Sequence, residues 1–317
     1  MTYTYKKLDI DCYIDSLYID GLQKSEIVSD EEIKHTITNI GIFKFKGYVK
    51  AFRNRLSDYT IDDILFLYDF DRKLSSHLFE LTSKIEIKLK TYLIETVYTF
   101  TDNPFFYLIL DNYKNSFNLS NDTLYEWEVK EQKGKKELYP HYRDYYLYKY
   151  DFQSNCETFL SGVKLIKINT QKNINYPPFH YLIESATLGT VIKLLSAITI
   201  DKNDILKLIG KKFGILNPKV FISYLLRLKE LRNRCAHNER LFNRNYRSVK
   251  AIGRYKDIRK NIYDHRLLDI YYSLYFLLDE KEQFQSSLDL EKKFMDNNLN
   301  ITNENLKIFI LSCLRES

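Results

Sequence analysis

The sequence predicts an all-α fold, and three observations support this class. Glycine and proline are scarce, at 9 and 5 of 317 residues, so the chain has few signals for turns or helix breaks. Apolar residues recur at helical spacing over a long segment that begins near residue 60. Hydrophobic residues make up 44% of the chain and charged residues 28%, which is typical of a globular protein with a sizeable core. A many-stranded β fold is disfavoured.

The first element is a helix that we expect to begin at Ser29 and Asp30, because two glutamates follow at once. The stretch 40–48 alternates phenylalanine with lysine, which fits a short strand or a loop over the core. We assign residues 1–56 to an N-terminal helical arm.

The longest predicted helix is capped by Thr60 and runs to about Tyr98, with Asp62 and Asp63 in its positive first turn. One face carries a stripe expected to be buried, formed by Leu67, Leu74, Leu78, Leu81, Ile85, Leu89 and Tyr92. The chain then turns within 102–122, and residues 128–150 are charged and rich in tyrosine. We interpret 102–175 as a charged insertion in a helical core that spans 57–280.

A new block begins at Pro177-Pro178, where 179–198 is predicted to be one buried helix with a bend at Gly189. A short helix should end near Gly210. Asn217 and Pro218 are an N-cap and a first helical residue, so a further helix begins there. Its apolar face consists of Phe221, Tyr224, Leu225, Leu228 and Leu231. We expect another helix over 261–280 and one or two within a C-terminal helical extension, 281–317.

Charge and cysteine content limit the classes of function. The net charge of +6 and the pI near 8.8 permit an anionic partner. The four cysteines are far apart and form no CxxC pair, which argues against a zinc site or a disulfide framework. The N-terminal residues are not apolar, and no stretch is long enough to span a bilayer. We therefore expect a cytoplasmic protein that needs no membrane, metal or cofactor.

The most informative segment lies on the helix that begins at Pro218, and it reads Arg232-Asn233-Arg234-Cys235-Ala236-His237. RNA is cleaved when its 2′-hydroxyl attacks the adjacent phosphorus, which requires proton transfer and stabilisation of phosphate charge. Histidine titrates in the right range, and the arginine fork fits phosphate oxygens. Five residues of helix place Arg232 and His237 about 140° apart, so one chain would present them to two sides of a groove.

The neighbours of these two residues suggest supporting roles. Asn233 lies four residues before His237 and shares its helical face, where it could orient the imidazole. If the helix persists, Arg240 and Arg244 continue that face. Cys235 and Ala236 are small, which would let an RNA backbone approach. Cys235 points away from His237, which argues against a Cys–His nucleophile pair.

Two other arginine–histidine pairs have similar spacing, namely Arg72 with His77 and Arg259 with His265. Arg72 is better explained as an intrahelical salt-bridge partner, and His77 as a surface or packing histidine. The 232–237 pair is preferred because a basic run follows it. Seven basic residues and one acidic residue lie between 244 and 260. A solvated face would explain this run equally well, but beside the motif it predicts RNA contacts from Arg244, Arg247, Lys250 and Arg254.

These segments resemble the bacterial Abi-like abortive-infection proteins of the AbiD/AbiF type, which belong to the HEPN group. The resemblance covers most of 8–245 and rests on Ile40-Gly41 with Gly47-Tyr48, on Leu67-Tyr68 with 70–74, on 85–89, on 178–189 and above all on 231–243. In this chain Leu188 replaces the usual phenylalanine, and His180-Tyr181 replaces a tryptophan pattern.

The resemblance implies a HEPN-like helical bundle and metal-independent endoribonuclease activity in phage defence or as the toxin of a toxin–antitoxin system. Arg232 and His237 would be catalytic, supported by Asn233, Asn238 and Arg240. HEPN sites are typically composite, so a homodimer is expected. The alternative is a non-catalytic RNA-binding protein held in complex with a small regulatory or antitoxin RNA. A third possibility is a helical scaffold for protein interactions.

Overall fold

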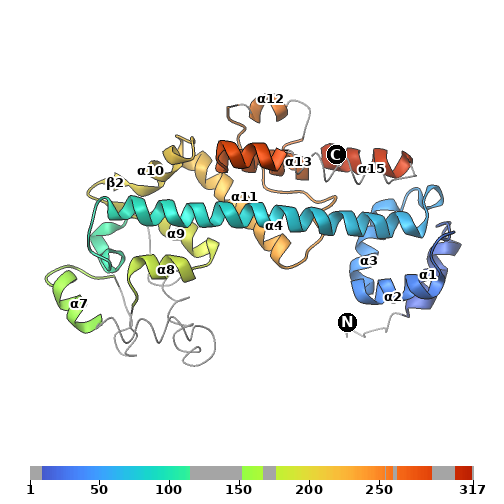
Figure 1. Ribbon diagram of the computed structural model, residues 1–317, viewed down its shortest axis with the longest axis horizontal. Coiled ribbons are helices and arrows are strands. Elements are labelled where there is room, and N and C mark those ends of the chain that lie inside the picture. Colours follow the sequence, from blue (N-terminus) through green and yellow to red (C-terminus); the bar gives the residue numbers. More distant parts are fainter. Residues whose placement is uncertain are drawn as a thin grey trace, which may run out of the picture. The chain divides into compact units, whose positions relative to one another are not determined.

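The computed structural model describes residues 9–114, 152–166, 176–253, 255–259, 263–287 and 304–315 (Figure 1). These residues are mostly helical. Among them, strand is limited to β1 (Thr199–Ile200) and β2 (Asn203–Asp204), which pair antiparallel with Ile200 opposite Asn203. The predicted all-α class is therefore confirmed. None of the described helices combines the length and the apolar character that crossing a membrane requires.

Contacts divide the chain into two compact units. The first comprises 1–82 and 230–317, and the second comprises 83–229. The three-part division expected from the sequence, with boundaries at 56 and 280, was based on sequence pattern and not on contacts, and it stays a prediction.

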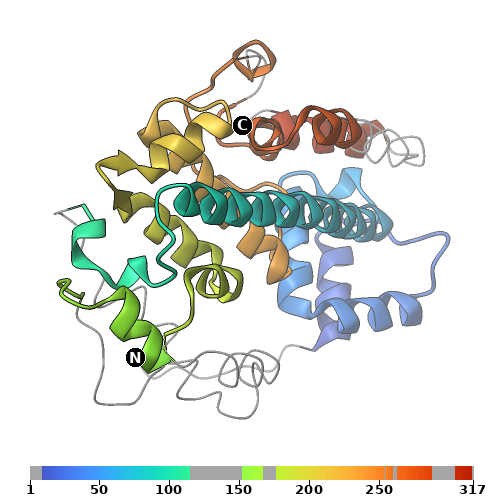
Figure 2. The ribbon, with the colours of Figure 1, turned by 60° about the vertical axis from the view of Figure 1, so that its left-hand side comes forward.

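The first unit begins with α1 (Ile10–Ile19), α2 (Asp30–Ile40) and α3 (Ile42–Val49), the blue helices of Figure 2, which contact one another in order. Short 3₁₀ turns, η1 (Lys50–Phe52) and η2 (Leu56–Asp58), follow. The α2 start agrees with the prediction, since Ser29 and Glu32 form a reciprocal capping box.

The expectation of a strand or loop over 40–48 is wrong. Gly41, at φ +87°, separates two helices, and Phe45, Tyr48 and Val49 are buried at helical spacing. Phe43 is 65% exposed although Phe45 is buried, so the alternating phenylalanines do not share one face of a sheet.

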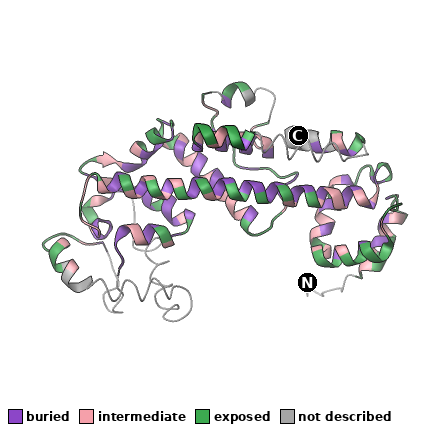
Figure 3. Cartoon of the chain, in the orientation of Figure 1, coloured by how far each residue is buried: buried purple, intermediate pink, exposed green. Residues whose placement is uncertain are grey.

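Helix α4 (Ile61–Tyr98) confirms the longest predicted helix. The Thr60 amide donates to Asp63 Oδ2 at 2.8 Å, and the Asp63 amide donates to Thr60 Oγ1 at 3.3 Å, so the capping is reciprocal. The predicted stripe is buried from Leu67 to Leu89 (Figure 3). Beyond it, Leu93 is buried, whereas Tyr92 is half-buried.

The second unit contains η3 (Phe106–Leu108), η4 (Leu110–Asn112), α7 (Phe152–Phe159), α8 (Phe179–Ser185), α9 (Leu188–Ala197) and α10 (Ile205–Lys212). The prediction of a single helix over 179–198 is wrong. Ala186 is extended at ψ 144°, and the Thr187 hydroxyl caps α9 by accepting from the Thr190 amide. The break therefore falls before Gly189. The Tyr-rich stretch 128–150 lies outside the described residues.

Helix α11 (Pro218–Ala236) begins as predicted, because Asn217 Oδ1 accepts from the Lys219 amide at 2.9 Å. Its predicted apolar face is at most 1% exposed. In the first unit the chain continues with α12 (Tyr255–Arg259), α13 (Leu267–Leu274), η6 (Tyr275–Leu277), helical residues 280–287 and α15 (Glu304–Arg315). Helix α13 contacts both α12 and α15.

Candidate active site

The motif lies where α11 ends. Arg232 and Asn233 are half-buried in its last turns, whereas His237 is exposed immediately after the last helical residue, Ala236. The His237 amide still donates to the Asn233 carbonyl at 3.0 Å, which keeps these two residues on the same side. The part of the chain that bears the candidate catalytic residues is therefore a helix terminus open to solvent.

A Schellman arrangement terminates the helix. The Asn238 amide donates to the Cys235 carbonyl at 3.1 Å, and the Glu239 amide donates to the Arg234 carbonyl at 2.9 Å. Asn238 has φ +52°, the left-handed conformation that this termination requires. The chain thus leaves the helix immediately after His237. The expectation that Arg240 and Arg244 continue the helical face is wrong.

Arg72 holds this turn in place. Its Nη1 donates to Asn238 Oδ1 at 3.1 Å and its Nη2 to the Glu239 carbonyl at 2.7 Å. It also pairs with Asp71 at 3.1 Å, with 17% of the Arg72 side chain exposed. The predicted ion-pairing role is only part of what Arg72 does, because it fixes the two residues that follow His237.

Asp71 is the buried anchor beneath the turn. Its side chain is fully buried, a position that a carboxylate occupies at low cost only when it is paired and hydrogen-bonded. It accepts from the Leu241 amide at 3.1 Å, the Phe242 amide at 2.8 Å and the Tyr48 hydroxyl at 2.6 Å. Burial, followed by the charge of Asp71, raises the pKa of Tyr48. Sequence reasoning did not identify Asp71 or Tyr48 as site residues, although both lie in segments that carry the family resemblance.

Arg240 connects the turn to α3. Its Nη1 donates to the carbonyl oxygen of Gly47, and this guanidinium nitrogen would lie 3.6 Å from a Cβ added to that glycine. Burial, followed by the positive charge of Arg244, lowers the pKa of Arg240. Arg240 is thus engaged in holding the turn.

Cys235 is buried, and this burial raises the pKa of its thiol to about 11. The expectation that Cys235 lets an RNA backbone approach is therefore wrong, whereas Ala236 is exposed. A thiol with this pKa stays protonated near neutral pH, consistent with the argument against a cysteine nucleophile.

A second set of contacts stiffens the last turn of α11 around Arg234. Arg234 Nη2 donates to Glu230 Oε1 at 3.0 Å, and its guanidinium lies 5.1 Å from the centre of the Tyr246 ring. Tyr246 is buried, and its hydroxyl donates to the Leu241 carbonyl at 2.9 Å. Tyr246 therefore connects the segment after the motif both to Arg234 in the helix and to Leu241 in the turn.

The described residues predicted to contact RNA lie in the irregular segment that follows the motif turn. Arg244, Arg247 and Lys250 are exposed, while Tyr246 and Val249 between them are buried. Arg254 lies outside the described residues. The described basic side chains are therefore presented to solvent by a segment that apolar side chains attach to the core.

The histidines of the two other arginine–histidine pairs, Arg72 with His77 and Arg259 with His265, have different surroundings from His237. His77 is 2% exposed and its ring stacks on Tyr271, with 6.2 Å between centroids, so it does not face solvent as His237 does. His265 Nδ1 lies 3.2 Å from Asp264, and the side chain of Arg259 lies outside the described part of the chain.

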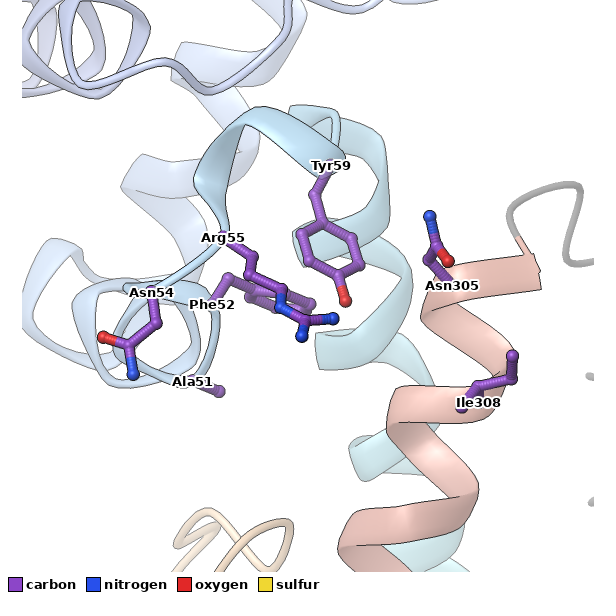
Figure 4. Close-up of a pocket in the computed structure, with 7 residues that line it drawn as sticks. All are labelled: Ala51, Phe52, Asn54, Arg55, Tyr59, Asn305 and Ile308. Carbon is purple, nitrogen blue, oxygen red and sulfur yellow. The ribbon is translucent and has the colours of Figure 1, made fainter.

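A cavity lies in the first unit, away from the motif residues (Figure 4). This cavity of about 320 Å³ is lined by Ala51, Phe52, Asn54, Arg55, Tyr59, Asn305 and Ile308, none of which belongs to the motif. In the described part of the chain, no three His, Cys, Asp or Glu side chains are grouped so that they could hold a metal ion.

Comparison with known families matches the chain to the model described as Abi-like protein over residues 35–243. This stretch contains α3, Asp71, Arg72 and the complete motif turn. No curated protein and no solved structure gives a significant match. Because the matched residues make up more than half of the chain, the protein belongs to the Abi-like protein family.

Proposed function

We propose that this protein is a metal-independent endoribonuclease of the HEPN type. Membership of the Abi-like family points to abortive infection, a form of phage defence, and RNA cleavage would arrest the infected host. The observation that carries the proposal is the motif turn. An exposed histidine follows directly after a helix that bears an arginine five residues earlier, and Arg72 and Asp71 hold the turn from below.

In the proposed reaction His237 accepts the proton of the RNA 2′-hydroxyl or donates one to the leaving oxygen, and water exchanges the other proton. The 2′-oxygen bonds to the adjacent phosphorus, the bond from phosphorus to the 5′-oxygen breaks, and that oxygen leaves with a proton. The products are a 2′,3′-cyclic phosphate and a 5′-hydroxyl. Arg232 binds the phosphate oxygens and offsets their growing charge. Asn233 supports His237 from the preceding turn.

The proposal includes a homodimer. Five positions of a regular helix correspond to about 140° around its axis, and on this basis Arg232 of one copy would act with His237 of another. Dimerisation can be tested with mixed dimers of Arg232→Ala and His237→Ala chains. A composite site predicts that the mixed dimer cleaves RNA although neither parent dimer does. A mixed dimer as inactive as its parents would contradict a site shared in this way.

Cleavage itself is tested with purified protein and total bacterial RNA in the presence of EDTA. We expect products with cyclic phosphate and 5′-hydroxyl ends. Removal of a group that transfers protons costs on the order of 100-fold or more, so His237→Ala should be nearly inactive, and Arg232→Ala similarly. His35→Ala is the matched control, because His35 is an exposed helical histidine outside the motif. Full cleavage by His237→Ala would refute the proposal.

A non-catalytic role as an RNA-binding protein predicts a different result. RNA would bind in a salt-dependent way through the exposed basic residues, without turnover by the wild-type protein and without an effect of His237→Ala. Such RNA could also be a small antitoxin that silences the nuclease. Sequencing the RNA that copurifies with the wild-type protein identifies it, and cleavage assays before and after its removal separate the two roles.

A further inference from the structure

A lysine on α3, Lys44, lies close enough to Asp71 and Arg72 to interact with their charges. Lys44 is half-buried, and its ammonium group makes no hydrogen bond or ion pair with a residue in the described part of the chain. Half-buried cations normally have a carboxylate partner or extend their charge into water. Burial, followed by the positive charge of Arg72, lowers the pKa of Lys44. The charge of Asp71 raises this pKa, but by less than the charge of Arg72 lowers it.

The position of Lys44 follows from the helix that bears it. Lys44 lies four residues before Tyr48 and shares its face of α3. That face is directed to the motif turn, because the Tyr48 hydroxyl binds Asp71 and the Gly47 carbonyl binds Arg240. Lys46, two residues further along, is engaged elsewhere, with its Nζ 4.4 Å from the centre of the Tyr13 ring.

The local charges do not balance. Lys44, Arg72 and Arg240 all interact electrostatically with Asp71, which is a single carboxylate with two oxygens already occupied by four donors. Three cations thus act on one buried carboxylate, while the nearby Glu239 carboxylate pairs with Arg234. Arg72 and Arg240 have their own contacts with the turn. Of these three cations, Lys44 alone makes no hydrogen bond or ion pair with the described residues, so its three donors face none of their acceptors.

We propose that Lys44 binds a backbone phosphate of the RNA next to the scissile one, in a subsite whose positive field Arg72 and Arg240 strengthen. This subsite rests on the proposed function, because it places the RNA strand across the turn that carries His237. The basic residues after the motif would contact the strand on one side, and α3 would contact it on the other. Binding by a lysine is a point-charge contact, so the subsite selects for a phosphate and not for a base.

The test is RNA binding by Lys44→Gln and Lys46→Gln, both in the full-length His237→Ala protein so that RNA is not consumed. The probe is a short fluorescent single-stranded RNA of mixed sequence, titrated at several salt concentrations. Loss of one phosphate contact lowers the slope of log affinity against log salt by about 0.7 for a single strand, equivalent to about fivefold in affinity at ~0.1 M salt. We expect this from Lys44→Gln, and no change from Lys46→Gln. Lys44→Arg, which keeps the charge, should retain the slope.

Three outcomes would overturn the subsite. They are equal slopes for both glutamine variants, an affinity loss for Lys44→Gln without a change of slope, and no RNA binding by the parent protein. Melting temperatures identify a variant that fails to fold. If Lys44→Gln fails to fold, Lys44→Met is compared with Lys46→Met, and the slope should fall for Lys44→Met alone; equal slopes would again overturn the subsite. Cleavage by the wild-type protein is measured separately. Absence of cleavage contradicts the endoribonuclease, whereas a missing Lys44 effect contradicts the subsite alone.

Discussion

Replacement of Asp71 by asparagine tests whether the motif turn depends on this carboxylate. Oδ2 of Asp71 accepts from the Tyr48 hydroxyl, the Leu241 amide and Arg72, whereas Oδ1 accepts from the Phe242 amide. The amide oxygen of an asparagine should take the place of Oδ2, because three donors converge there. Its NH₂ group then faces the Phe242 amide, and two donors oppose each other.

The cost follows from these contacts. A buried amide that loses its acceptor costs about 1–3 kcal/mol. The remaining bonds lose the assistance of a full negative charge and become roughly half as strong. The total is about 2–4 kcal/mol, less than the 5–15 kcal/mol by which folded proteins are typically stable, so Asp71→Asn should fold. The loosened turn should displace His237, and a displacement of ~1 Å lowers a catalytic rate on the order of 100-fold.

Urea unfolding followed by circular dichroism measures the first effect, and cleavage of RNA measures the second. Tyr48→Phe is the matched comparison, since it removes one hydrogen bond to the same carboxylate without opposing two donors, and it should cost about 1.5–3 kcal/mol. A change below about 0.5 kcal/mol in Asp71→Asn, the range of ordinary surface substitutions, would refute the anchoring role of Asp71. Wild-type cleavage in a clearly destabilised variant would refute the inference that the turn positions His237.

Three further outcomes are expected. Asn238→Ala should destabilise the protein by about 1–2 kcal/mol more than Asn238→Gly, because φ +52° is strained for a residue with a Cβ and not for glycine, and equal urea midpoints would contradict this. The raised pKa of Tyr48 means that the unfolded chain loses this proton first, so stability should fall as pH rises above about 10, by up to ~1.4 kcal/mol per pH unit, and less steeply in Tyr48→Phe. If stability falls with pH as steeply in Tyr48→Phe as in the wild type, Tyr48 is not the group responsible. Gly210→Ala should cost about 1–3 kcal/mol, because its Cβ would lie 2.7 Å from the Ile215 carbonyl oxygen, and a melting temperature equal to that of wild type would show that the backbone adapts.

Local sequence signals predicted the helix starts well. Ser29, Thr60 and Asn217 all cap helices, since a short polar side chain satisfies amides only two or three residues away. The errors arose where tertiary burial overrode local pattern. Residues 42–49 are helical because their apolar side chains meet the core at helical spacing. The break at Ala186 has neither a glycine nor a proline at that position to predict it.

The candidate site shows the same limit. Spacing and residue type identified Arg232, Asn233 and His237, and they assigned the motif to a helix. They did not predict that the helix ends at Ala236. It ends there because Asn238 adopts a left-handed conformation, and the presence of an asparagine does not by itself predict that conformation. For the same reason, the sequence wrongly placed Arg240 on the helical face that Asn233 and His237 share.

The sequence by itself determined the helical class, the capped helices and the pair of residues proposed to act on RNA, because each depends on neighbours within a few positions. Only the tertiary structure decided what surrounds that pair. Arg72 reaches Asn238 across 166 positions, Asp71 reaches Phe242 across 171 and Arg240 reaches Gly47 across 193. A buried carboxylate must gather its donors from wherever the folded chain brings them, and no local pattern records which donors these will be.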